Sequence, residues 1–239
     1  MAMKLDTAGS AEGVVWRTVQ SVSFPRSGHL LLYGLLRKYF GEGFSRCEYY
    51  HCCQSVPCKK GAVYQKNHDF ELDLSNDPET FHIIQYRRSA QAQLNAYFRF
   101  VHFPKQRAFF GRQSERPARP DAYIADSARL KRKYRRFIKK NRTYFEGFVR
   151  KWVLTNTNPN TYLLEYADFV AQPLPHLTAL IRLLASAHPV DEVRVATLID
   201  EADIAYKHNL AEDPLYMPDF NERFGVTDVE DRVSGLAVR

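Results

Sequence analysis

A short loop between an apolar run and a helical pattern carries residue types that bind anions. Pro25-Arg26-Ser27-Gly28 follows the apolar, β-branched stretch 14–24, and leucines at helical spacing begin at Leu30. The pattern predicts a strand, a tight loop and a helix. Unpaired N–H groups and the helix dipole attract negative charge there, and Arg26 and Ser27 add donors. The loop is a candidate phosphate or sulfate cradle, with an ordinary turn as the alternative.

Two arginines follow another apolar run. The stretch Phe81–Tyr86 predicts a buried strand, and Arg87 and Arg88 come directly after it. Each guanidinium can donate paired hydrogen bonds to a phosphate. Asn95, eight residues after Arg87, would lie two turns along the next predicted helix. The cluster is either a second phosphate site or a solvated arginine pair at the end of a strand.

Lys66 and His68 are candidates for acid–base chemistry beside a bound anion. A predicted strand over 62–66 ends in Lys66, and the two-residue spacing would put His68 on the same side. A lysine can neutralise developing negative charge, and a histidine can accept a proton near neutral pH. A single histidine is more often a surface or hydrogen-bonded residue, which is the alternative for His68.

The four cysteines of the chain, Cys47, Cys52, Cys53 and Cys58, lie within twelve residues. Zinc sites usually place cysteines in pairs two to four residues apart, and this spacing fits none of those patterns well. We therefore expect reduced thiols and no metal. A metal site, with His51 and His68 as possible further ligands, and local disulfides are the alternatives.

Alternating strands and helices have to position these clusters. The pattern predicts a single α/β domain over 14–239, with a central mostly parallel β-sheet flanked by helices, and a flexible tail over 1–13. Ligands bind at the carboxyl ends of such strands, where the anion-binding clusters fall. The predicted strands are 14–24, 62–66, 81–86 and 161–166, and the predicted helices are 30–40, 90–101, 127–154, 174–187 and 191–202.

Four motifs in this order resemble the sulfotransferase family that uses 3′-phosphoadenosine 5′-phosphosulfate (PAPS). The resemblance spans about residues 14–187, and it implies a P-loop-NTPase-like sulfotransferase architecture. The matching stretches are Phe24-Pro25-Arg26-Ser27-Gly28-His29-Leu30, Lys66-Asn67-His68, Arg87 with Asn95, and the Tyr-Glu-Asp-like turn in 163–169 before Pro173.

The resemblance implies a role for each matched residue. His68 would be the general base that takes a proton from an acceptor hydroxyl or amine, and Lys66 and Arg26 would neutralise charge during in-line transfer. The product would be adenosine 3′,5′-bisphosphate, and no metal would be required. Arg26, Ser27, Gly28, His29 and Leu30 would hold the 5′-phosphosulfate, Arg87 and Asn95 the 3′-phosphate, and Tyr166 would lie near the adenine.

The chain departs from the family pattern in three places. Leu30 stands where a hydroxyl residue is usual, which removes a hydrogen bond worth on the order of 1.5–3 kcal/mol, and His29 could replace it in part. Asn95 stands in place of a serine. The basic, glycine-rich segment that many members lay over the cofactor is not recognisable after Asn209. Arg112, Arg116, Arg119 and Lys207 are candidates to substitute for it.

The long segment 103–126 is expected to shape the acceptor pocket. It carries three prolines and little periodicity, and loops of this length are often lids or binding loops. Its aromatic residues Phe109, Phe110 and Tyr123 favour a small-molecule or glycan acceptor.

The basic run 129–140 suggests a rival function. A net charge of +7 favours anionic partners, so a surface for an acidic acceptor or partner and a non-catalytic nucleic-acid-binding protein are alternatives. Apolar residues at helical spacing instead predict one packed stripe and a solvated charged face. The stripe is Leu130, Tyr134, Phe137, Ile138, Phe145, Phe148, Val149 and Trp152.

A kinase-like P-loop enzyme is the nearest enzymatic rival, but the Gly-x-x-x-x-Gly-Lys-Ser/Thr motif is absent.

Hydropathy indicates no membrane partner. No apolar stretch approaches the roughly 20 residues that span a bilayer, and residues 1–13 lack the apolar core of a signal peptide. These patterns predict a cytoplasmic protein.

Overall fold

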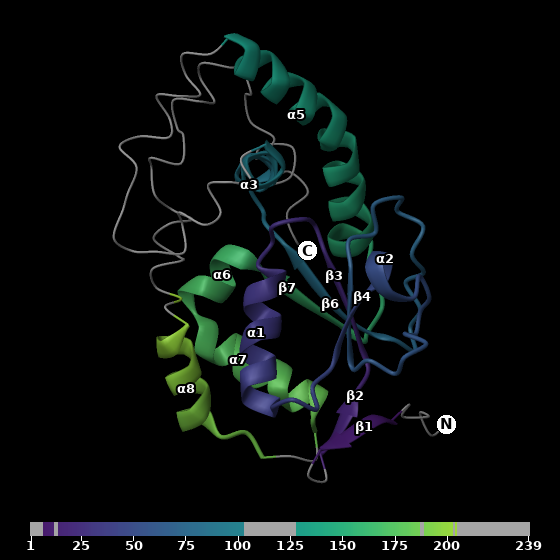
Figure 1. Cartoon of the computed structure of the whole chain (residues 1–239), viewed down its shortest axis with the longest axis vertical. Coiled ribbons are helices and arrows are strands. Elements are labelled where there is room, and N and C mark those ends of the chain that lie inside the picture. Colours follow the sequence, from purple (N-terminus) through teal and green to yellow (C-terminus); the bar gives the residue numbers. More distant parts are fainter. Residues whose placement is uncertain (1–6, 12–13, 103–127, 187–188, 203, 205–239) are drawn as a thin grey trace.

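A parallel sheet covered by helices on both faces forms the centre of the molecule (Figure 1). The computed structural model describes residues 7–11, 14–102, 128–186, 189–202 and 204. Within these residues the sheet has five strands, and every neighbouring pair of strands is parallel. The predicted α/β class with a parallel central sheet is therefore confirmed.

The central strand of the sheet is β3 (Val19–Ser23), and all five of its residues are buried. The strand order is β4-β5-β3-β6-β7. Parallel neighbours need crossover connections, which here are helical on both sides of the sheet. The remaining strands are β4 (Arg46–Glu48), β5 (Tyr64–Asn67), β6 (Phe81–Tyr86) and β7 (Thr161–Glu165).

Two apolar clusters, one on each face, hold the helices on the sheet. Leu32, Ile83 and Leu180 belong to the first, and Val22, Phe148 and Trp152 to the second. The first face carries α1 (His29–Phe40), α6 (Tyr166–Ala171), α7 (Pro173–Leu184) and α8 (Glu192–Glu201). The second carries α3 (Ala90–His102), α5 (Ala128–Val149) and a π-helical segment, Arg150–Leu154.

The N-terminal part of the chain differs from the prediction. The predicted strand 14–24 is two strands, β2 (Val14–Arg17) and β3. β1 (Thr7–Ala11) pairs antiparallel with β2, so part of the predicted flexible tail is a strand. The sequence Thr7-Ala8-Gly9-Ser10-Ala11 has no apolar alternation, so a local pattern does not predict this strand.

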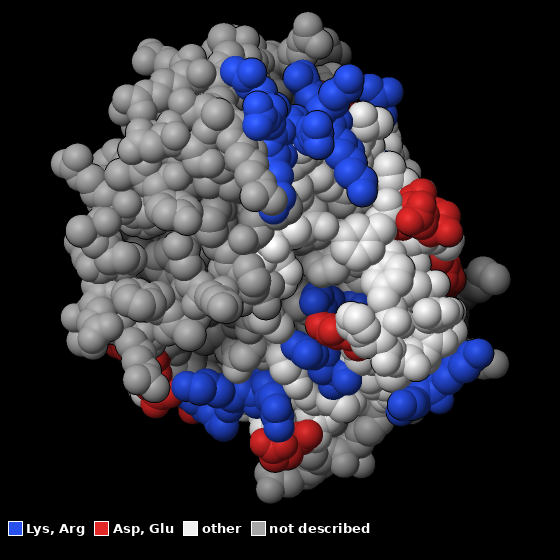
Figure 2. Space-filling model, turned by 45° about the horizontal axis from the view of Figure 1, so that its top comes forward, with Lys and Arg blue, Asp and Glu red and all other residues white. Residues whose placement is uncertain are grey.

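Helix α5 has the amphipathic character that its sequence predicts. Tyr134, Phe145 and Phe148 are buried, whereas most of the Lys and Arg side chains are exposed. Figure 2 shows these charges gathered at the top of the molecule, where α5 runs in Figure 1. The exposed basic residues are Arg132, Lys133, Arg135, Arg136, Lys139 and Lys140.

No helix among the described residues has both the length and the apolar composition to cross a bilayer. Several predicted features lie outside the described residues. They are the segment 103–126 with Phe109, Phe110 and Tyr123, the stretch after Asn209, and the candidate cations Arg112, Arg116, Arg119 and Lys207.

A buried histidine in β6 gives the first prediction, which concerns stability and pH. His82 is 1% exposed, its ring centroid lies 5.4 Å from that of Trp152, and Asn158 Nδ2 lies 3.1 Å from its Nδ1. Burial lowers the pKa of His82 to about 4, with Asp77 and Lys151 as its charged neighbours.

Below pH 6.5 the unfolded chain therefore binds a proton at His82, whereas the folded chain stays unprotonated there until the pH approaches 4. The contribution of His82 to the free energy of unfolding is therefore fully present above pH 6.5 and is lost as the pH falls toward 4. For His82 alone we expect a loss of about 2 kcal/mol at pH 5. Urea unfolding at pH 7.5 and pH 5 measures this difference in the free energy of unfolding, which should be smaller in His82→Gln than in the parent protein. His51→Gln, at an exposed residue, is the control. If His51→Gln reduced the difference as much as His82→Gln does, the assignment to His82 would be wrong.

Candidate functional site

The connections after β3 and β6 leave the sheet in opposite directions. β3 leads into α1 on one face, and β6 leads into α3 on the other. The two strands are neighbours in register, with Ser23 opposite Gln85. In open α/β sheets this divergence opens a crevice at the carboxyl ends of the strands, where ligands bind. Both predicted anion-binding clusters lie at this place, directly after β3 and β6.

The loop between β3 and α1 is held from α3. Ser27 Oγ donates to Gln93 Oε1 at 2.8 Å, and Gln93 Nε2 donates to the carbonyl oxygen of Pro25. Gln93 is fully buried and acts as a brace for the loop. No local pattern predicts this role, because the contacts join residues far apart in the chain. The Ser27 hydroxyl, predicted to face the anion, is engaged by this brace.

Helix α1 begins with free donors and close packing. Its N-cap Gly28 supplies no side-chain cap and has φ +87°, so the first-turn N–H groups have no partner within the helix. A Cβ on Gly28 would come 2.6 Å from the Tyr166 ring. Only glycine satisfies both the backbone conformation and this contact.

Arg87 lies between the loop and Tyr166. Its Nε and Nη2 both donate to the carbonyl oxygen of Arg26 at 3.3 Å, and its guanidinium carbon lies 3.8 Å from the Tyr166 ring centroid. Burial lowers the pKa of Arg87, although an arginine stays charged at neutral pH. The structure thus brings together Arg26, Gly28, Arg87 and Tyr166.

The neighbouring Arg88 has a different environment. Its Nη2 lies 2.5 Å from Asp168 Oδ2, and its backbone N–H donates to Glu165 Oε1 at 3.1 Å. Glu165 also caps α6, because its Oε2 accepts from the N–H of Asp168 at 2.9 Å. This cap fixes the start of α6 and therefore the position of Tyr166.

His29 faces the sheet. Its Nδ1 lies 3.3 Å from Ser21 Oγ and 3.4 Å from Gln85 Nε2. Burial, reinforced by the charge of Lys66, holds the pKa of His29 well below its ordinary value. The ring is therefore neutral and engaged beneath α1, and only the backbone N–H of His29 belongs to the free helix end. Leu30, in the same first turn, is 58% exposed.

His68 is oriented by the end of β3. Its Nδ1 lies 2.6 Å from the carbonyl oxygen of Ser23, so Nδ1 carries the proton and Nε2 carries the lone pair. Burial lowers the pKa of His68 to about 4, the Ser23 hydrogen bond opposes this shift, and Lys66 adds to it. The imidazole is thus neutral at pH 7, in the state that accepts a proton.

Lys66 is engaged by a carboxylate. Its Nζ lies 2.6 Å from Glu48 Oε1, which also lies 3.7 Å from Arg46 Nη2. The Lys66 side chain is 17% exposed. The predicted pair of Lys66 and His68 therefore lies at the carboxyl end of β5, the strand next to β3. Glu48 balances the charge of Lys66.

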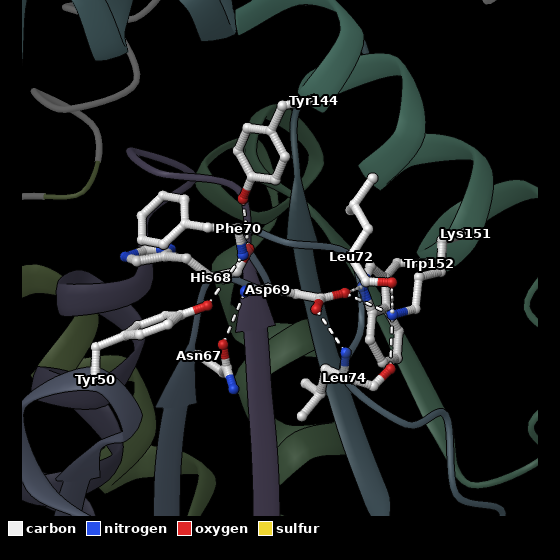
Figure 3. Close-up of polar contacts among 10 residues, drawn as sticks. All are labelled: Tyr50, Asn67, His68, Asp69, Phe70, Leu72, Leu74, Tyr144, Lys151 and Trp152. Atoms are coloured by element: carbon white, nitrogen blue, oxygen red, sulfur yellow. Dashed lines mark hydrogen bonds and ion pairs between the residues drawn. The ribbon is translucent and has the colours of Figure 1, made fainter. Parts of the chain in front are cut away.

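The turn after His68 is anchored to the helical layer of α5 and the π-helical segment that follows it (Figure 3). Asp69 is buried, and its carboxylate accepts from Lys151 Nζ at 2.7 Å, Trp152 Nε1 at 2.7 Å and the N–H of Leu74 at 2.8 Å. The hydroxyl of Tyr144 donates to the carbonyl oxygen of His68. The position of His68 depends on these contacts, which join residues about 80 positions apart and which no local pattern predicts.

Asn95 lies in α3, but its side chain is outside the described part of the structure, so its predicted contact with the 3′-phosphate stays a prediction.

The second prediction tests the anchor. Asp69→Asn removes the charge that Lys151 requires, and breaking a buried pair in this way should lower the free energy of unfolding by about 3 kcal/mol. Urea denaturation measures the change. Glu146→Gln breaks the exposed pair with Arg142, 2.7 Å apart, and should cost less than about 1 kcal/mol. Equal losses of unfolding free energy in the two variants would show that the buried Asp69 contacts stabilise the fold no more than an exposed ion pair does.

The sequence matches no protein-family model, and it matches no curated protein. A function for this site therefore has to be argued from the chemistry of its own residues.

Proposed function

We propose that the protein is a sulfotransferase that moves a sulfuryl group from PAPS to a hydroxyl or amine of a small-molecule or glycan acceptor. The observation that carries the proposal is the position of Arg87, on the Tyr166 ring and on the Arg26 carbonyl, beside the uncapped end of α1. An arginine, an aromatic face and free N–H groups are together suited to a nucleotide with two anionic ends. The resemblance in motif order supports the same proposal.

The donor would bind across the crevice between β3 and β6. The first-turn N–H groups of α1 and the Arg26 side chain would hold the 5′-phosphosulfate, and Arg87 and Asn95 would hold the 3′-phosphate. Tyr166 would lie near the adenine, beside the guanidinium of Arg87 that its ring already stacks on, and Gly28 lets that ring approach the loop. The proposal includes the P-loop-NTPase-like sulfotransferase architecture for the parallel sheet and its helices.

The transfer would use His68 as the general base. The acceptor oxygen or nitrogen attacks sulfur, the bond between sulfur and the bridging phosphate oxygen breaks, and the acceptor proton moves to His68 Nε2. Adenosine 3′,5′-bisphosphate leaves with the negative charge. A pKa of about 4 makes His68 a weak base in the free protein, and the negative charge of a bound donor raises a neighbouring histidine pKa. Lys66 would exchange Glu48 for an oxygen of the moving group.

The third prediction concerns nucleotide binding. Adenosine 3′,5′-bisphosphate should bind and raise the melting temperature, and isothermal titration calorimetry should give its affinity. Arg87→Ala should weaken binding by about 10- to 100-fold, because charge-assisted hydrogen bonds are lost. Arg88→Ala is the matched control, since Arg88 is exposed and paired with Asp168, and its affinity should stay within about twofold of the parent value.

Two rival ligands give the contrary outcomes. Stabilisation by ATP with magnesium but not by the bisphosphate would favour a kinase-like enzyme. Stabilisation by RNA alone would assign the function to the basic face of α5. Either result would overturn the sulfotransferase proposal.

The fourth prediction concerns the base. His68→Gln should retain the affinity for the bisphosphate and lower turnover by about 10²- to 10⁴-fold, because the proton has no acceptor. The assay follows label from sulfur-labelled PAPS into a panel of phenols, alcohols, amines and glycans. His51→Gln serves as the control at an exposed histidine. Unchanged turnover in His68→Gln would remove His68 from the role of base.

A further inference from the structure

The segment between β4 and β5 brings all four cysteines of the chain together. Cys47 lies in β4, Cys52 ends the short helix α2 (Tyr49–Cys52), and Cys53 and Cys58 follow it. Their Sγ atoms all lie within 4.8 Å of one another. Cys47 and Cys58 are buried, and the other two are partly exposed. Four sulfur atoms at such short mutual distances are either a metal site or a site of disulfide exchange.

The distances favour a metal. Zinc–thiolate bonds of about 2.3 Å in a tetrahedron separate the sulfur atoms by roughly 3.8 Å. Cys47 Sγ and Cys53 Sγ lie 3.5 Å apart, and all four cysteines are free. A disulfide requires a separation of about 2.05 Å. The sulfur atoms are therefore not bonded in pairs, and their mutual distances of at most 4.8 Å allow all four to reach one zinc ion.

We propose that Cys47, Cys52, Cys53 and Cys58 bind one structural zinc ion. Four thiolates complete the coordination of zinc and leave no open position, which is typical of a structural site. Gln65 Nε2 lies 3.5 Å from Cys53 Sγ and 3.9 Å from Cys47 Sγ, so a fixed donor stands beside the two sulfur atoms, as around other metal ligands.

The zinc site would brace the strands that hold Lys66. Glu48 follows Cys47 in β4 and pairs with Lys66, and Gln65 precedes Lys66 in β5. The segment between the two strands contains only one short helix, and its apolar cluster consists of the cysteines and Ala62. A bound ion would supply the fixed geometry that so small a cluster lacks. The inference does not rest on the sulfotransferase proposal.

The fifth prediction is a metal analysis of the full chain. Protein expressed with added zinc and purified under reducing conditions without chelator should contain about one zinc ion per chain by atomic emission. Cobalt(II) exchanged into the protein should show the intense charge-transfer and ligand-field absorption of a tetrahedral thiolate complex. Both readouts use the parent protein and do not depend on whether a variant folds.

Variants then identify the ligands. Cys53→Ser and Cys58→Ser should each lose zinc or bind it at least tenfold more weakly, while His51→Ala should keep it. Because the chain has only four cysteines, alkylation with and without prior reduction reports on this cluster alone. Protein without stoichiometric metal overturns the proposal, whether its thiols are free or are alkylated only after reduction.

Discussion

The buried carboxylate of Asp69 is the interaction on which the arrangement of the site depends. Removing a carboxylate from water is costly unless its oxygens are satisfied, and here Lys151, Trp152 and the N–H of Leu74 satisfy them. The lysine and tryptophan come from the π-helical segment after α5, so one side chain joins the end of β5 to the second helical layer. His68 directly precedes this anchor, and its own ring is tied to β3.

A polar layer beneath α1 contrasts with the apolar core around it. Ser21 Oγ lies 2.7 Å from the Tyr64 hydroxyl and accepts from Gln85 Nε2 at 2.9 Å, and His29 completes the group. His29 Nε2 and Gln85 Oε1 are buried without a hydrogen-bond partner. Apolar residues would pack here at lower cost, and exceptions of this kind concentrate at functional sites. The layer lies on the sheet face beneath the helix whose N-terminus borders the crevice, where the proposed donor would bind.

Local patterns predicted the elements far better than the contacts between them. The strand Phe81–Tyr86 has the predicted bounds, and the helix predicted over 30–40 begins one residue earlier, at His29, because apolar periodicity is a property of neighbouring residues. The brace from Gln93 and the convergence of the cysteines depend instead on chain folding. The cysteine spacing fits no zinc pattern, since α2 and the following segment, rather than a short knuckle, bring the sulfur atoms together.

The contact between Arg87 and the Arg26 carbonyl has a thermodynamic consequence. A long arginine side chain loses rotamer entropy when it is immobilised, at a cost of up to about 2 kcal/mol. Stacking on Tyr166 and hydrogen bonding to the loop fix Arg87 before any ligand arrives. That entropy is lost during folding rather than during association. The anion proposed to bind here would therefore meet a preorganised guanidinium, and a larger share of its interaction energy would appear as affinity.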